Sequence, residues 1–225
     1  MGTLQVGGTT LGVKNTTTNK IDLSNADLLS SSSIPASIGG TWIKLEEKTA
    51  SGQATLEMGS ASLLSSTYDM YCIKVVNFSV DTPGSNPYGR FNINADGAAS
   101  AAVYRYTAST FRSDVTSPVV LHNQGHSGTS FYMGYAIDTT ANVSNDCHMN
   151  GFVYLPQPSS TSKLSSAFGT MQIVGDENHR VSHTNFVATY MNNNSVNQAL
   201  TGFQFLLSGS GNISAGKFVL YGIKD

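Results

Sequence analysis

The chain has 225 residues, and only 12% of them are Asp, Glu, Lys or Arg, about half the usual fraction of roughly 25%. The formal net charge is −2 and the sequence has no basic stripe, so the composition excludes a nucleic-acid-binding surface. No apolar run approaches the roughly 20 residues that a membrane-spanning helix needs. The start, Met1-Gly2-Thr3-Leu4, lacks the cationic and apolar regions of a signal peptide, which predicts a protein kept in the cytosol until it is released.

Uncharged hydrogen-bonding residues replace the missing charges. Ser, Thr and Asn are abundant, and they disfavour helix interiors because their side chains compete for backbone groups or stiffen χ1. Twenty-two glycines supply turns, and no window repeats apolar residues with helical spacing over three turns. We therefore predict an all-β chain with one main domain that is large enough to bury a core without disulfides.

Residues 1–40 differ from the rest because glycine, threonine and serine clusters interrupt them repeatedly. Their apolar residues are sparse and alternate over short distances, as in strands with one face to bury. We predict an N-terminal arm over 1–40 that reaches a neighbouring subunit, and a β-sandwich domain over 41–225. The predicted assembly contacts of the arm are Leu4, Val6, Leu11 and Val13.

Short strand candidates separated by polar turns follow from Thr41 to the end of the chain, which favours a sandwich or barrel. The predicted strands are 42–48, 53–58, 68–80, 89–94, 101–107, 118–122, 131–137, 148–155, 167–174, 181–191, 199–207 and 217–223. The fold we expect is a jelly-roll-like antiparallel β-sandwich with an extended N-terminal arm.

Two of these strands have apolar residues on both faces, as interior strands do. In the strand 68–80, alternation predicts one face with Tyr71, Ile73 and Val75 and an opposite face with Cys72, Val76 and Phe78. In the last strand, Gly222 lies among large apolar residues, which predicts a close backbone approach there.

The two cysteines, Cys72 and Cys147, are too few for a disulfide framework. A bond between them remains an alternative, but the apolar run around Cys72 favours two buried free thiols.

Several motifs resemble those of virion structural proteins of marine tailed bacteriophages, the cyanophages and pelagiphages. The opening Gly2-Thr3-Leu4-Gln5-Val6-Gly7-Gly8-Thr9-Thr10-Leu11 is similar to the start of those proteins, and Asp22-Leu23-Ser24-Asn25 to the step that follows. Ser66-Thr67-Tyr68-Asp69 and Phe91-Asn92 resemble internal steps of their modules. The ending, from Ser210-Gly211-Asn212 to Phe218-Val219-Leu220-Tyr221-Gly222-Ile223, resembles the ending of phage virion and fibre modules.

The resemblance covers about a fifth of the chain and implies a virion structural role on β-sandwich modules, often as a homotrimer. It implies other virion proteins as partners, such as the major capsid protein or the tail and neck proteins, and a place in the virion after assembly in the bacterial host cytoplasm. It carries no catalytic residue.

Catalytic and metal-binding patterns are weak. His122 and His126 are separated by what we predict to be a turn, and His179 and His183 by a loop entering a strand, so neither pair shares a helix face. Cys147-His148 has no second cysteine nearby to complete a zinc site. We therefore predict no metal, no cofactor and no catalytic residue.

A polysaccharide-degrading enzyme would need two carboxylates facing each other across a sugar ring. Glu46 and Glu47 are neighbours in a predicted strand and therefore point to opposite faces. Asp176 and Glu177 are interpreted as solvated loop charges.

Aromatic residues could stack on sugars. Tyr104 and Tyr106 flank Arg105, and Phe131, Tyr132 and Tyr135 cluster, although this spacing is more typical of side chains that pack on a sheet face or at an interface.

The leading hypothesis is a capsid decoration or cement protein of a bacteriophage. The alternative is a tail, neck or head fibre module that binds a host glycan, and an enzyme ranks third.

Overall fold

The computed structural model describes residues 3–6, 9–14, 21–22, 42–92, 103–113, 119–137, 147–174, 181–191 and 198–224. The chain divides into two compact units, unit 1 (Met1–Trp42) and unit 2 (Ile43–Asp225). In unit 1, the strands β1 (Thr3–Val6), β2 (Thr9–Lys14) and β3 (Ile21–Asp22) form a three-stranded antiparallel sheet in chain order. The short strands predicted in this segment are therefore present.

Twelve strands make up the described part of unit 2, one for each strand predicted from the sequence. β4 begins at Trp42, the last residue of unit 1. The strands are β4 (Trp42–Ala50), β5 (Thr55–Met58), β6 (Met70–Val80), β7 (Pro87–Asn92), β8 (Val103–Arg112), β9 (Val119–Gly128), β10 (Phe131–Tyr132), β11 (His148–Pro156), β12 (Ser166–Val174), β13 (Val181–Met191), β14 (Gly202–Leu207) and β15 (Ile213–Ile223).

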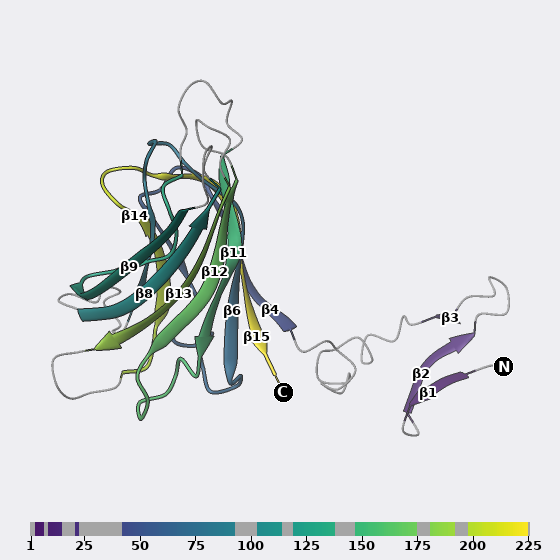
Figure 1. Ribbon diagram of the computed structural model, residues 1–225. Helices are drawn as coiled ribbons and strands as arrows, with labels where there is room; N and C mark the ends of the chain where they lie inside the picture. The colour runs from purple at the N-terminus through teal and green to yellow at the C-terminus, as the bar shows by residue number, and fades with distance from the viewer. Residues whose placement is uncertain are drawn as a thin grey trace. The chain divides into compact units, whose positions relative to one another are not determined.

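The strands form two sheets that pack face to face, with the order β4-β15-β6-β11-β12-β13-β8-β9 in the large sheet and β10-β7-β14-β5 in the small sheet (Figure 1). Eight of the strands pair as nested antiparallel partners: β4 with β15, β5 with β14, β6 with β11, and β7 with β10. This nesting is the topology of a jelly roll, in which each sheet receives four strands. The predicted fold class is confirmed.

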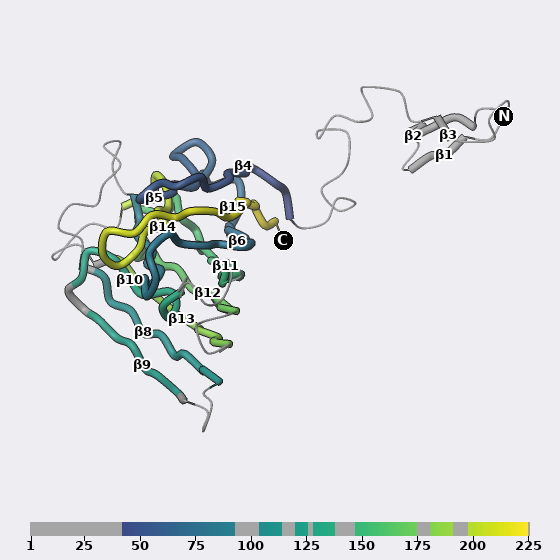
Figure 2. Tube along the Cα trace, turned by 90° about the horizontal axis from the view of Figure 1, so that it is seen from above, coloured from purple at the N-terminus to yellow at the C-terminus, as the bar shows by residue number. Residues whose placement is uncertain are grey.

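Two insertions widen the large sheet beyond the jelly roll. The β8–β9 hairpin enters between β7 and β10, and the β12–β13 hairpin enters between β11 and β14. The insertions join through the pairing of β13 with β8, so β9 becomes the outer strand at the end of the sheet away from β4 (Figure 2). Half of the large sheet is therefore built by segments that the jelly roll itself does not need.

The core lies between the two sheets and is rich in aromatic rings. Phe91 contacts Tyr104, Phe131 and Phe203 with centroid separations of 5.5, 5.5 and 6.0 Å. All four side chains are fully buried, and they come from both sheets. Burying one such side chain is worth about 1.5–3 kcal/mol, so this cluster contributes strongly to holding the sheets together.

One face prediction for β6 is wrong, and a β-bulge explains why. Phe78 was predicted to face away from Tyr71, but it is fully buried and contacts Phe205 of the small sheet, with 6.4 Å between ring centroids. The register with β11 and β15 shifts at this point, and Asn77 adopts a φ of 53°. One extra residue in a strand reverses the faces of the residues after it.

A second correction concerns residues 123–125, which were predicted to form a turn. They belong to β9, which runs from Val119 to Gly128 and pairs with β8. The sequence Asn123-Gln124-Gly125 is polar and therefore resembles a turn. Because β9 is the outer strand of the sheet, apolar side chains would add less to its stability there. By contrast, β10 ends at Tyr132, earlier than predicted.

The close backbone approach predicted at Gly222 is confirmed. A Cβ atom on Gly222 would lie 2.4 Å from Cδ2 of Tyr68, so the tyrosine ring packs directly on the glycine backbone.

Candidate interaction surface

The two cysteines pack in the interior of the protein. Cys72 and Cys147 are both free and buried, as the sequence favoured. Burial raises the pKa of the Cys72 thiol to about 12. In the described part of the chain, no group of three or more His, Cys, Asp or Glu side chains could hold a metal ion. The described residues also form no helix with the length and apolar character to span a membrane.

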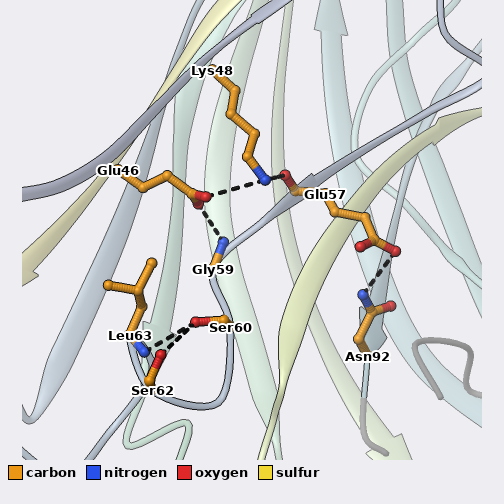
Figure 3. A network of polar contacts seen from close by, with 8 residues as sticks. All are labelled: Glu46, Lys48, Glu57, Gly59, Ser60, Ser62, Leu63 and Asn92. Carbon is orange, nitrogen blue, oxygen red and sulfur yellow. Dashed lines mark hydrogen bonds and ion pairs between the residues drawn. The ribbon is translucent and has the colours of Figure 1, made fainter. Parts of the chain in front are cut away.

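The carboxylates of Glu46 on β4 and Glu57 on β5 accept hydrogen bonds from backbone and side-chain donors nearby (Figure 3). Glu46 accepts a hydrogen bond of 2.6 Å from the backbone N–H of Gly59 and pairs with Lys48 at 3.1 Å. Lys48 also donates to the backbone carbonyl of Glu57 at 2.8 Å, and the Glu57 carboxylate accepts from Asn92 at 3.1 Å. These contacts tie β4 to β5 and to Gly59 directly after it, and β5 to β7.

Glu47 serves a different contact from its neighbour Glu46, as predicted for adjacent strand residues. Its carboxylate pairs with Lys217 of β15 at 2.7 Å and with Lys44 at 2.5 Å. The hydrogen bonds from Lys217 and then Lys44 hold the pKa of Glu47 below its usual value. Glu46 and Glu47 therefore do not form a facing carboxylate pair.

The outer face of the small sheet carries a row of paired polar side chains. Gln204 of β14 lies between Glu57 of β5 and Arg90 of β7 in the strand register. Its amide nitrogen donates to the Glu57 carboxylate, and its amide oxygen accepts from Nε of Arg90 at 2.8 Å. Beside this row, Asn92 donates to Glu57, but its buried side-chain oxygen has no hydrogen-bond partner among the described residues.

The outer face of the large sheet is different because aromatic rings lie open on it. Phe152 and Tyr154 of β11 and Phe168 of β12 form a stack that we call the aromatic ladder. Tyr154 and Phe168 are 5.2 Å apart at 16° between planes, and Phe152 and Tyr154 are 6.4 Å apart at 26°. Phe168 keeps 40% of its surface exposed. Water therefore contacts a run of rings that the core of the protein does not use.

Charge is unevenly distributed on this face. The six strands from β6 across to β9 contain no Asp or Glu. Lys74 of β6 and Arg105 of β8 are both exposed there, and neither forms an ion pair with any residue that the structure describes. At the β4 end of the same sheet, Glu47 pairs with Lys217 of β15. The six strands therefore carry exposed cations with no carboxylate among them.

A groove lies on the same face, at the junction of the two insertions where β13, β8 and β9 run side by side. It has a volume of about 470 Å³. Arg105, Thr107, Gln124 and Thr189 supply polar groups, and Val187 supplies apolar surface. In register, Thr189 lies beside Arg105, and Thr107 lies between Val187 and Gln124.

Two described histidines form hydrogen bonds with polar neighbours. His183 contacts Thr170 at 3.0 Å and Asn185 at 3.1 Å, and His122 contacts Ser109 at 3.1 Å. Both lie in strands, His183 in β13 and His122 in β9.

The four assembly contacts predicted from the sequence lie in unit 1, Leu4 and Val6 on β1 and Leu11 and Val13 on β2, and their side chains fall outside the described part of the chain. Asp176, Glu177 and His179 also lie outside the described residues.

Sequence reasoning missed the aromatic ladder, because alternation marks which residues share a face but not which face the second sheet covers.

Among the aromatic residues proposed for sugar binding, Tyr104, Phe131 and Tyr132 are buried in the core. The structure therefore confirms the packing interpretation for these three. Arg105 and Tyr106 of the same segment both line the groove.

Comparison with protein-family models, curated proteins and solved structures finds no match for this chain.

Proposed function

We propose that this chain is a non-catalytic structural protein of a bacteriophage virion, and that it decorates the capsid surface. The motifs shared with phage virion proteins support the virion setting. The observation that carries the proposal is the aromatic ladder on the outer face of a sandwich whose own core is already filled. Large apolar surfaces that remain open on a filled fold are typical of protein–protein contacts.

The partner proposed for the ladder is a second copy of the chain. The phage resemblance implies a homotrimer, in which each copy would contribute two different surfaces to the ring. In this proposal, one of these surfaces is the face that carries the ladder.

Attachment to the particle is assigned to unit 1. Among the residues whose burial the structure describes, the core residues all lie between Ala50 and Leu220, within unit 2. We propose strands β1 and β2, with Leu4, Val6, Leu11 and Val13, as the contact with a capsid protein. Many identical weak contacts on one particle add up to tight binding.

The test uses particles of the phage that encodes the chain. Immunogold labelling with an antibody against unit 2 is expected to mark the capsid, and a variant without residues 1–40 is expected to keep its fold and lose particle binding. Purified particles that carry no label would overturn the virion assignment. Undiminished binding of the truncated variant would overturn the role of unit 1.

A tail, neck or head fibre module is the second candidate. The groove between β13, β8 and β9 favours it, because a fibre needs a binding site for a host molecule and a decoration protein does not. Gold labels on the tail or neck instead of the capsid would select this candidate.

A further inference from the structure

The groove has an origin in the backbone of β9. Tyr104 pairs with Gly128 and Tyr106 with Gly125, so β9 contains one more residue than β8 over this stretch. Such a bulge interrupts the ladder of hydrogen bonds and bends the strand, and bulges are frequent beside binding sites. A Cβ atom at Gly125 would lie 2.5 Å from Cε1 of Tyr106, so the tyrosine ring fills the space beside the glycine. The backbone of Gly125 and the ring of Tyr106 therefore both shape the hollow.

Its electrostatics favour an anion. Arg105 is exposed, and the described residues offer it no carboxylate partner. The strands that surround the groove, β13, β8 and β9, contain no Asp or Glu. A guanidinium binds a carboxylate through two parallel hydrogen bonds, which gives both charge and orientation.

The remaining lining is neutral and of two kinds. Thr107, Thr189 and Gln124 can each donate and accept hydrogen bonds. Val187, which is exposed, forms the apolar part, and the volume of about 470 Å³ lies within the range of roughly 300–1,000 Å³ that is common for small-molecule sites. A sugar ring matches this combination, since it has hydroxyl groups around its edge and C–H groups on its faces.

We propose that the groove binds an acidic sugar unit of a polysaccharide, with the carboxylate on Arg105 and the hydroxyl groups on Thr107, Thr189 and Gln124. The single charge of a uronate carboxylate matches the one exposed cation in the lining. The aromatic ladder lies on β11 and β12, apart from the polar residues of the groove. The inference goes beyond assembly and applies to a decoration protein and a fibre alike.

The experiment titrates the full chain with oligomers of galacturonate, glucuronate and mannuronate by calorimetry. For an oligomer that binds, the fully methyl-esterified form has the same ring without the charge, and we expect it to bind at least tenfold more weakly. Arg105→Gln is expected to lower the affinity for the charged oligomer about tenfold. Thr107→Val, which removes a hydroxyl at nearly constant shape, is expected to lower it by a smaller factor.

Lys74→Gln is the matched control, because it removes one exposed cation from the same face outside the groove. Its affinity should stay within twofold of the original. Equal losses in Arg105→Gln and Lys74→Gln would overturn the site in favour of general attraction to a cationic face. Absence of binding to all three charged oligomers, equal binding of the methyl ester, or stronger binding of inorganic phosphate would also overturn it. Because the titration uses free protein, its result is independent of where the chain sits on a particle.

Discussion

Tyr154 and Phe168 stack almost parallel on the outer face of the large sheet, with 5.2 Å between ring centroids and 16° between planes. The two residues are directly opposite each other in the register of β11 and β12. Cross-strand aromatic pairs of this kind contribute only roughly 0.2–1 kcal/mol to the stability of a sheet, and this pair leaves apolar surface exposed to water. Their position is therefore better explained by a contact between chains than by the stability of one chain.

Replacement of Phe168 by Ser is expected to weaken self-association at least tenfold. The reason is that the variant removes exposed apolar surface from the proposed contact. The free energy of unfolding of the monomer should change by less than about 1 kcal/mol, because Phe168 contributes little to the core. Sedimentation velocity over a concentration series measures the association, and three chains of 23.8 kDa are the expected assembly.

Leu164→Ser is the control for this variant. Leu164 is 51% exposed in the segment before β12 and belongs to neither the ladder nor the groove. Equal weakening of association by both substitutions would contradict the assignment of the ladder as the contact.

The bulge in β6 gives a second prediction. Asn77 has a φ of 53°, a left-handed conformation that costs a β-branched residue about 1–2 kcal/mol and costs glycine almost nothing. Asn77→Val is therefore expected to lower the free energy of unfolding by about 1–2 kcal/mol, whereas Asn77→Gly should stay within about 0.5 kcal/mol of the original. Urea unfolding followed by circular dichroism measures both. If the two variants were equally stable, β6 would not contain a left-handed residue at this position.

This bulge also shows where sequence reasoning stops. The twelve strands described in unit 2 were each predicted at least in part, because polar turn residues separate them and apolar residues alternate within most of them. The face of Phe78 was not, because a single inserted residue in β6 leaves no mark on composition or spacing. The groove was equally hidden, since it needs the pairing of β13 with β8, two segments brought together from different insertions.

Gly222 provides a third prediction, through its contact with Tyr68. Gly222→Ala would place a methyl group 2.4 Å from Cδ2 of the tyrosine ring, which also packs edge-on against Tyr71 with 5.6 Å between centroids. Displacing the ring is expected to cost about 1–3 kcal/mol of unfolding free energy.

The matched comparison is Gly222→Ala in a Tyr68→Ala background. Without the ring, the added methyl group has room, so the second substitution should cost much less than it does alone. Equal costs in the two backgrounds would show that the glycine is needed for another reason.

Alkaline pH should destabilise the protein through groups that are buried in their neutral forms. Burial raises the pKa of Cys72 from 9.0 to about 12, although a hydrogen bond with Tyr154 lowers it slightly, and burial raises that of Tyr132 from 10.0 to about 12. A group whose pKa is higher in the folded state stabilises that state fully below its unfolded pKa. This stabilisation is lost as the pH rises toward the folded value, because the unfolded chain releases its protons first. The free energy of unfolding is thus expected to fall steadily between about pH 9 and pH 12.

Urea midpoints measured at intervals from pH 7 to pH 11 test this loss, and Cys72→Ala separates the thiol from the tyrosine. The variant lacks the group that titrates first, so its midpoint should fall later and less steeply above pH 9 than that of the original chain. Between pH 7 and pH 8 both proteins should show flat profiles, since neither group ionises there in either state. A decline of the same slope in the two proteins would assign the alkaline loss to Tyr132 and other buried tyrosines and remove Cys72 from it.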